Sequence, residues 1–345
     1  MEITKAFPGG NIRIIKEEKG IYILDNELRD STEDWFYWAF AVDGKKGEKA
    51  KFSFPDVRLG PFGPAVSYDL FEWGWLGKDG KNTFSYEFKE DGRVYFAHSM
   101  LYLPERFYAF SEKQNLEIKE LCKTKKGRSV PVVTFGDGEE IILLTARHHA
   151  CESTGSYVLE GVLERLISKN IPDFKVICIP FVDFDGVTDG DQGKGRAPHD
   201  HNRDYETDKA AIYPETEAIR KIADGKIAYA FDFHSPWHMG GRNDKCFIVE
   251  KSHLIKDNAE AFSCLLEREI SDDSFCYKAE NNLSPDTEWN KSDTPCFTTY
   301  MINRGAKMAF SLETAYFGEE GNVFSGKDGV ALGRCFAEAL MKFAK

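Results

Sequence analysis

The sequence has no apolar run that approaches the roughly 18 residues needed to cross a bilayer. Its first residues contain Pro8, Gly9 and Gly10 where an export signal would carry an apolar block. The eight cysteines include no CxxC pair, which favours reduced thiols over a disulfide framework or a cysteine zinc site. Together these absences predict a soluble, cytoplasmic protein without an export signal.

Positive charge is also scarce, with 45 Lys and Arg against 57 Asp and Glu and a formal net charge of -12. This balance argues against nucleic acid or an anionic membrane surface as a partner. HExxH, P-loop and GxSxG patterns are absent as well. What remains is a globular composition, 42% hydrophobic and 14% aromatic, over 345 residues, which exceeds most single cores and predicts two domains.

The first hundred or so residues predict an all-β sandwich. Aromatic and β-branched residues gather in short segments that Gly, Asp and Asn turns separate. Two of these segments, 35–42 and 49–54, flank residues 43–47, which we interpret as a hairpin loop. Residues 111–126 are compatible with a helix instead, and we place a domain boundary near residue 115. The predicted strands are 11–15, 20–24, 35–42, 49–54, 83–88 and 93–98.

Strands and helices alternate beyond this boundary. The predicted strands are 130–134, 140–146, 176–180, 227–234, 246–250 and 307–313, and the predicted helices are 157–169, 214–223, 257–269 and 327–344. This alternation indicates an α/β fold with a mixed open sheet flanked by helices. The sequence therefore predicts a β-sandwich domain over 1–115 and an α/β domain over 116–345.

Polar residues follow the first long apolar strand of the α/β part. His149 and Glu152 lie three positions apart across a strand-to-helix turn, a spacing that can bring both side chains to one metal ion. A helix start explains the same spacing, because Glu152 would favour the positive end of the helix dipole. His148 is a competing ligand, but at the same offset it reaches Cys151.

Two further strands also end in polar residues. Period-two alternation puts Asp232 and His234 on one face of strand 227–234, which suggests a ligand histidine with a supporting carboxylate. A hydrogen-bonded, partly buried histidine is the simpler interpretation of this pair alone. Glu313 closes strand 307–313 and is either an exposed strand end or an acid/base group.

The polar loop 183–205 separates the first two of these strand ends. Its length and its content of Gly and charge are typical of a functional loop. Arg196, Asn202 and Arg203 could grip a carboxylate, because a guanidinium fork matches carboxylate geometry. We interpret His199 and His201 as solvated loop histidines.

These motifs form a recognisable series in the order HxxE, DGV with a downstream NR pair, DFHS, and a strand ending in Glu. The series resembles the zinc carboxypeptidases of the M14 family. DWFYWAFAV and VYFAHSMLYLPERFYAFSEK resemble the β-sandwich domain that precedes the peptidase domain in the cytosolic carboxypeptidase branch. The resemblance covers nearly the whole chain and implies one Zn²⁺ ion as cofactor.

The resemblance also implies roles for single residues. His149, Glu152 and His234 would be the zinc ligands, with a fourth position open for water. Glu313 would be the general base that deprotonates the attacking water. Asp200 would orient the ligand His149 from behind.

Substrate contacts are implied in the same way. Asn202 and Arg203 would hold the terminal carboxylate of the substrate, and Arg196 would stabilise the oxyanion, with Lys194 as its substitute. Thr298 falls at the specificity position, where branch members that remove glutamate tend to carry a basic residue. Thr298 and the negative net charge therefore argue against acidic tails as substrate.

The expected function is hydrolysis of the C-terminal peptide bond of peptides or proteins by a zinc metallocarboxypeptidase. The expected partner is a peptide or protein C-terminus. Two alternatives stay open. A zinc amidohydrolase, deacylase or murein-peptide hydrolase could use the same site, and a catalytically silent peptide-binding module could keep the fold.

Overall fold

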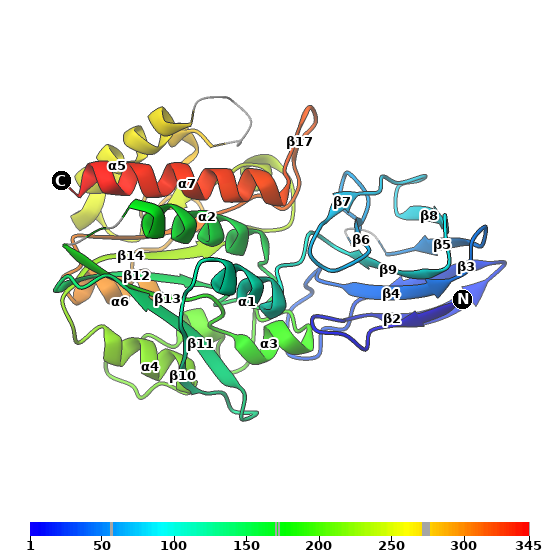
Figure 1. Cartoon of the computed structure of the whole chain (residues 1–345), viewed down its shortest axis with the longest axis horizontal. Helices are drawn as coiled ribbons and strands as arrows, with labels where there is room; N and C mark the ends of the chain where they lie inside the picture. Colours follow the sequence, from blue (N-terminus) through cyan, green and yellow to red (C-terminus); the bar gives the residue numbers. More distant parts are fainter. Residues whose placement is uncertain (56–57, 170, 172, 271–276, 345) are drawn as a thin grey trace.

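The computed structural model describes residues 1–55, 58–169, 171, 173–270 and 277–344. An all-β part holds the N-terminus and lies beside a larger α/β part, at whose far end the chain terminates (Figure 1). The predicted fold class, an α/β domain with a mixed sheet preceded by an all-β sandwich, is confirmed. No helix among the described residues is long and apolar enough to span a bilayer.

The all-β part consists of two sheets, with strand orders β1-β4-β9-β6-β7 and β2-β3-β5-β8. Aromatic rings fill the space between them, as in the contacts of Phe40 with Phe52 and of Phe84 with Phe96. The strands are β1 (Glu2–Thr4), β2 (Arg13–Glu18), β3 (Ile21–Asp25), β4 (Ala39–Gly44), β5 (Lys49–Ser53), β6 (Ala65–Ser67), β7 (Gly74–Trp75), β8 (Thr83–Glu87) and β9 (Gly92–Ala97).

The hairpin predicted around residues 43–47 is wrong. β4 pairs with β1 and β9, whereas β5 pairs with β3 and β8, so the connecting segment crosses from one sheet to the other. The reason lies in the buried side chains of the two strands. Phe40 and Val42 of β4 and Ala50 and Phe52 of β5 all belong to the core between the sheets, and strands of opposite sheets can bury these faces against each other.

The α/β part is built on a seven-stranded sheet with the order β10-β11-β13-β12-β14-β16-β15. β13, β12, β14 and β16 run parallel, while β10, β11 and β15 pair in antiparallel fashion. The strands are β10 (Ile118–Lys123), β11 (Ser129–Phe135), β12 (Glu140–Ala146), β13 (Phe174–Ile179), β14 (Ile227–His234), β15 (Phe247–Val249) and β16 (Met308–Glu313).

Helices cover both faces of this sheet. Figure 1 shows α2, α5 and α7 above the sheet and α4 below it, and α6 packs on β14 and β16. The helices are α1 (Pro104–Lys113), α2 (Thr154–Lys169), α3 (Phe184–Asp189), α4 (Pro214–Ile222), α5 (Lys256–Glu269), α6 (Phe297–Asn303) and α7 (Gly326–Phe343). A short hairpin of β17 (Gly318–Glu319) and β18 (Asn322–Val323) precedes α7.

The helix predicted over 111–126 is wrong for most of its length. α1 ends at Lys113, Asn115 takes a left-handed φ of 53°, and β10 follows as an edge strand. Because β10 is mostly exposed and charged, its sequence resembles a helix surface. α1 itself buries Phe107 and Phe110 in the core of the α/β part, although it precedes the predicted boundary near residue 115.

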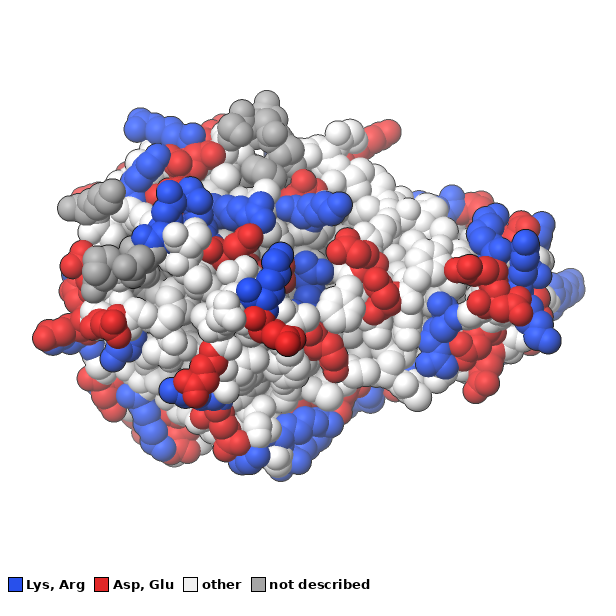
Figure 2. Space-filling model, in the orientation of Figure 1, with Lys and Arg blue, Asp and Glu red and all other residues white. Residues whose placement is uncertain are grey.

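Charged side chains of both signs are interspersed over most of the face shown in Figure 2. Ion pairs tie the basic residues of α7 to neighbouring helices, for example Arg334 to Glu164 at 2.7 Å and Lys342 to Glu269 at 2.5 Å. Such pairing cancels the basic charge of this helix locally.

Candidate active site

The site lies where three neighbouring parallel strands end. Thr145 of β12 is opposite Asp232 of β14, and His234 of β14 is opposite Glu313 of β16. Carboxyl ends of parallel strands share one edge of an open sheet, and sites form there. The register therefore brings the polar ends of β12, β14 and β16 together.

The turn after β12 is shaped by Arg147. This residue has a left-handed φ of 62° and is buried. Its guanidinium donates to the carbonyls of Ala150 at 2.9 Å and Tyr102 at 2.8 Å. These bonds hold the turn so that His149 and Glu152 face the same space before α2 begins.

The side chains of His149 and His234 both point their Nδ1 atoms at the carboxylate of Glu152. His149 Nδ1 lies 2.7 Å from Glu152 Oε1, and His234 Nδ1 lies 2.6 Å from Glu152 Oε2. All three side chains are buried, and their potential ligand atoms lie within 4.8 Å of one another. Two imidazoles and one carboxylate form a donor set that zinc accepts, with a further position open.

Each histidine of this set has a carboxylate behind it. His149 Nε2 lies 3.6 Å from Asp200 Oδ1, and His234 Nε2 lies 2.5 Å from Asp232 Oδ2. The other oxygen of Asp232 lies 2.8 Å from His148 Nδ1. Supporting carboxylates of this kind fix the tautomer and the ring orientation of metal-binding histidines.

A second group that could hold a metal consists of His148, Asp232 and His234. Its members His148 and Asp232 are fully buried and do not line the cavity at the strand ends. His148 is further occupied by the Tyr205 hydroxyl, 2.8 Å from its Nε2. This group lacks access for a substrate and is better suited to support His234.

The charges of the cluster favour a cation between its carboxylates. Burial by itself would raise the pKa of Glu152, but the imidazoles of His149 and His234 hold it well below its usual range. Burial opposes the charged form of His234, yet Asp232 and Glu152 raise its pKa well above the ordinary value. The carboxylates thus recruit positive charge to the place where a divalent ion would lie.

A cavity of about 270 Å³ opens beside this cluster and includes Glu313 in its lining. Glu313 is buried, and its Oε2 has no hydrogen-bond partner among the described residues. Burial raises the pKa of Glu313 to about 7, while the imidazole of His234 works in the opposite direction. A buried carboxylate with a free oxygen and a pKa near neutrality is suited to accept a proton.

The polar loop 183–205 contributes three further side chains to the cavity lining, Lys194, Asn202 and Arg203. Lys194 Nζ lies 3.3 Å from His149 Nε2, and Asn202 Nδ2 lies 3.4 Å from His234 Nε2. The Asn202 side-chain oxygen accepts a bond of 3.1 Å from the backbone N–H of Phe297, at the start of α6. The loop thus places the hydrogen-bond donor Asn202 and the cations Lys194 and Arg203 in the same cavity as the carboxylates of Glu152 and Glu313.

Two predicted substrate contacts are not brought to this cavity. Arg196 points away from it and forms ion pairs with Asp30 and Asp183 at 2.8 Å each, because its guanidinium is drawn into a separate carboxylate cluster. Thr298 is buried behind the cavity, with its Oγ1 3.3 Å from the sulfur of Cys296. Cys296 lines the cavity in its place.

Several cavity residues were not anticipated from the sequence, among them Trp35, Trp237, Lys251 and Trp289. Trp237 follows the DFHS motif by two positions, which could have signalled it. Lys251 follows the antiparallel β15, to which the rule for parallel strand ends does not apply. Trp35 comes from the all-β part, and no local pattern links it to the α/β strands.

No protein-family model matches the sequence. Among curated proteins, the chain is 24% identical over 406 residues to cytosolic carboxypeptidase 6 of Caenorhabditis elegans, covering 98% of this chain and 86% of that protein. It is 24% identical over 316 residues to cytosolic carboxypeptidase 2 of Danio rerio, covering 78% of this chain. The chain spans only 42% of the length of that Danio rerio relative.

A solved structure has the same architecture. It is a metallo-carboxypeptidase from Pseudomonas aeruginosa in complex with (2-guanidinoethylmercapto)succinic acid, with a TM-score of 0.82 over 100% of this chain and 99% of that chain. At 17% sequence identity this likeness establishes the fold. Together with the sequence relatives it confirms the resemblance stated from the motifs: the chain is similar to cytosolic carboxypeptidases of the M14 family.

Proposed function

We propose that this chain is a cytoplasmic zinc carboxypeptidase that hydrolyses the last peptide bond of peptides or proteins. One observation carries the proposal. A single cavity is lined by side chains that could hold a metal, by the cations Lys194 and Arg203, and by the buried Glu313, whose Oε2 has no hydrogen-bond partner among the residues that the structure describes. Each part of carboxypeptidase chemistry has a candidate residue there.

His149, Glu152 and His234 would hold the zinc ion. When bound, zinc supplies Lewis acidity that lowers the pKa of water and polarises a carbonyl group. The donor set fits it, since two imidazole nitrogens and a carboxylate oxygen converge in a buried site. Asp232 and Asp200 lie behind the two histidines and would keep their Nδ1 atoms aimed at the ion.

Glu313 would accept a proton from the attacking water and pass it to the leaving amine. Its Oε2 has no hydrogen-bond partner in the described part of the chain, and Glu313 lines the cavity beside the ligand set. A base with a pKa near the working pH accepts and returns a proton with little energetic penalty in either direction. The raised pKa of Glu313 supports this role.

Arg203 and Asn202 would select a chain end by binding its free carboxylate. Arg203 lines the cavity and can offer a guanidinium fork to two carboxylate oxygens. Asn202 is fixed by the backbone N–H of Phe297 and leaves its side-chain amide toward the site. Together they would orient the last residue so that its peptide bond lies beside Glu313.

Lys194 would stabilise the oxyanion that forms on the scissile carbonyl. Arg196 was the first candidate from the sequence, with Lys194 as the substitute. Lys194 lines the cavity with its ammonium 3.3 Å from His149, whereas Arg196 is engaged elsewhere. A fixed cation in a site sheltered from water stabilises developing negative charge strongly.

The proposal is tested with zinc-loaded protein and peptides that differ in their last residue. Hydrolysis of free-carboxylate peptides is expected, and a chelator should abolish it until zinc is restored. The same peptides with an amidated C-terminus should resist hydrolysis, because Arg203 and Asn202 would have no carboxylate to bind. If no last residue is released from any free-carboxylate peptide, the proposed function is wrong.

Replacing Arg203 with Ala should chiefly raise KM for free-carboxylate peptides. The guanidinium contacts the terminal carboxylate in the ground state and the transition state alike, so its loss weakens binding more than kcat. We expect KM to rise by about 10-fold to 100-fold, the equivalent of one charge-assisted hydrogen bond. Steady-state kinetics would measure this change.

Arg304→Ala provides the matched control. Arg304 is exposed, pairs with Asp224 and lies outside the cavity. Its removal should leave both kinetic constants unchanged. An unaltered KM in the Arg203→Ala variant would remove Arg203 from the carboxylate-binding role.

Hydrolysis should fail at acid pH as Glu313 takes up a proton. Burial raises the pKa of Glu313 from 4.5 to about 7. The positive charge of a bound metal ion would lower this pKa to a value between these two limits. kcat/KM should therefore have an acid limb between pH 4.5 and about 7, falling about tenfold per pH unit below the apparent pKa.

Asp191 must be separated from Glu313 in this profile, because burial raises the pKa of Asp191 to about 6. An Asp191→Asn variant should keep the acid limb. A limb that vanishes with this substitution, or a rate that rises as pH falls through the window, would contradict the assignment to Glu313.

A further inference from the structure

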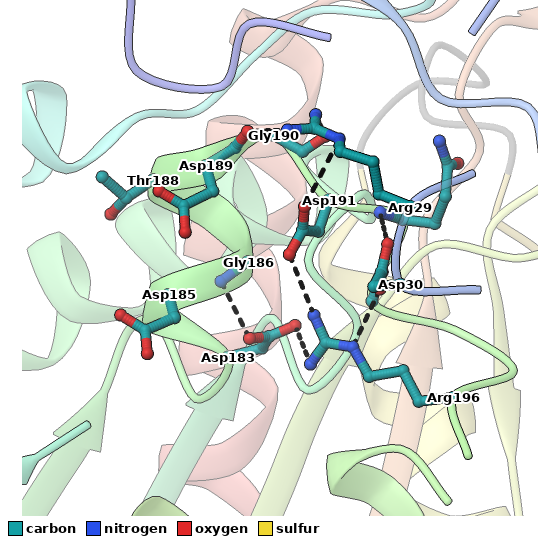
Figure 3. A network of polar contacts seen from close by, with 12 residues as sticks. Arg29, Asp30, Asp183, Asp185, Gly186, Thr188, Asp189, Gly190, Asp191 and Arg196 are labelled. Atoms are coloured by element: carbon teal, nitrogen blue, oxygen red, sulfur yellow. Dashed lines mark hydrogen bonds and ion pairs between the residues drawn. The ribbon is translucent and has the colours of Figure 1, made fainter. Parts of the chain in front are cut away.

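The loop that carries Lys194 is held by the all-β part of the chain. Asp30, in the segment between β3 and β4, accepts bonds from the backbone N–H groups of Gln192 at 2.9 Å and Gly193 at 2.8 Å. It also accepts a bond of 2.8 Å from Nε of Arg196 (Figure 3). One carboxylate thus fixes the backbone directly before Lys194 and the side chain two positions after it.

Thr32 fixes the other side of Lys194. The carbonyl of Gly195 accepts bonds from the Thr32 N–H at 3.0 Å and from its hydroxyl at 2.7 Å. Gly193 and Gly195 both have left-handed φ angles, 73° and 62°. A Cβ on Gly193 would lie 2.0 Å from the backbone nitrogen of Ala150. Hydrogen bonds therefore hold the backbone on both sides of Lys194, at glycines whose left-handed φ angles other residues rarely adopt.

Arg196 acts as the centre of this clamp. Figure 3 shows its guanidinium between Asp30, from the segment between β3 and β4, and Asp183 and Asp191, which lie on either side of α3. The distances are 2.8 Å to Asp30 and Asp183 and 3.6 Å to Asp191. Arg196 and Asp30 are only 13% and 12% exposed. Removal of Arg196 would leave the buried carboxylates poorly compensated, whereas removal of the Asp30 charge would leave Arg196 paired with Asp183.

The side chain of Lys194 is placed by the same segment. Its ammonium lies 3.3 Å from His149 Nε2 and 5.9 Å from the ring centroid of Trp35. Trp35 follows Asp30 by five positions, lines the cavity and packs against Trp237 at 4.8 Å. The all-β part thus supplies both the anchor for the backbone of Lys194 and a wall beside its side chain.

From these contacts we propose that Asp30 is a positioning residue for catalysis, which sets the place of Lys194 through Gly193 and Arg196. The inference rests on the proposed role of Lys194 at the oxyanion. If Asp30 has this role, the all-β part is a component of the active site. A displacement of about 1 Å in a catalytic group can cost about 100-fold in rate, so the clamp matters although Asp30 touches no substrate.

The test is a double-mutant cycle between Asp30→Asn and Lys194→Ala. Lys194→Ala should lower kcat by about 100-fold to 1000-fold, as removal of an oxyanion donor does. Asp30→Asn should lower kcat by about 10-fold to 100-fold with little change in KM. In the Lys194→Ala background, Asp30→Asn should bring no further loss of kcat, because its effect passes through Lys194.

Asp34→Asn is the matched control. Asp34 lies in the same segment and pairs with Arg58 within the all-β part, and among the described residues it forms no hydrogen bond or ion pair with the loop 183–205. Its kcat should equal that of the unchanged protein. Equal losses from Asp30→Asn in both backgrounds, or an effect confined to KM, would overturn the inference.

Hydrogen exchange gives a readout apart from activity. The amides of Gln192 and Gly193 should exchange faster in Asp30→Asn but not in Asp34→Asn, since only Asp30 binds them. Should Asp30→Asn fail to fold, Thr32→Val removes only the hydroxyl bond to Gly195 and should show a smaller loss of kcat. Unchanged exchange in the clamped loop would contradict the inference.

The outcomes also separate this inference from the proposed function. No turnover by the unchanged protein on any peptide would contradict the proposed function itself. Turnover that is equally fast in Asp30→Asn would contradict only the positioning role.

Discussion

Replacement of Glu313 by Gln is expected to abolish turnover while zinc stays bound. Gln keeps the size of the side chain but cannot accept a proton from water, and Glu313 is not a member of the His149, Glu152 and His234 set. Loss of a general base lowers kcat by about 100-fold to 10,000-fold. Metal analysis of the purified variant, together with kcat on the best peptide, would check both halves of the expectation.

Glu250→Gln is a demanding control for this prediction. Glu250 is a buried carboxyl group in the same part of the fold, and burial raises its pKa as it does for Glu313. It does not line the cavity, so its replacement should leave kcat unchanged. Retained turnover in Glu313→Gln would refute the general-base role, and equal losses in the two variants would point to a loss of structure instead.

The strand-end residues of the site could be predicted from the sequence because each one is marked by its immediate neighbours in the chain. Apolar runs that end in His234 and Glu313, or a few residues before His149, identify buried strands with polar ends. In an open α/β sheet such ends lie at one edge, whatever the order of the strands. The structure adds the order, which makes β12, β14 and β16 direct neighbours and puts His234 opposite Glu313.

The choice between Lys194 and Arg196 could not be made from the sequence. The two residues are two positions apart in a loop, and the direction of each side chain depends on the φ angles of Gly193 and Gly195. Hydrogen bonds hold these two glycines to Asp30 and Thr32, which lie more than 150 positions earlier in the chain. Sequence spacing cannot contain that information.

Long-range packing also explains the remaining differences. Trp35 reaches the cavity because the two parts of the chain pack together around Phe36, Tyr316 and Phe317. The crossing between β4 and β5 was mistaken for a hairpin because Gly and Asp turns look alike whether they join strands of one sheet or of two.

Replacement of His234 by Ala is expected to cost the protein its metal. His234 provides one of the two imidazoles of the donor set, and its removal leaves Glu152 and Asp232 without the histidine between them. Changes behind a metal site cost about 10-fold to 100-fold in affinity, so the supporting variant Asp232→Asn should lose zinc within that range and His234→Ala should lose more. Titration with a competing chelator would rank the two affinities.

His253→Ala supplies the control for a lost imidazole. His253 is exposed and faces Asp286, outside the cavity, so this variant should bind zinc as the unchanged protein does. The order of the zinc affinities of these variants matters more than any single affinity. A general loss of stability would not lower zinc affinity in this order. If His234→Ala retains stoichiometric zinc at the original affinity, the ion is held by other residues, and the donor set of His149, Glu152 and His234 is wrong.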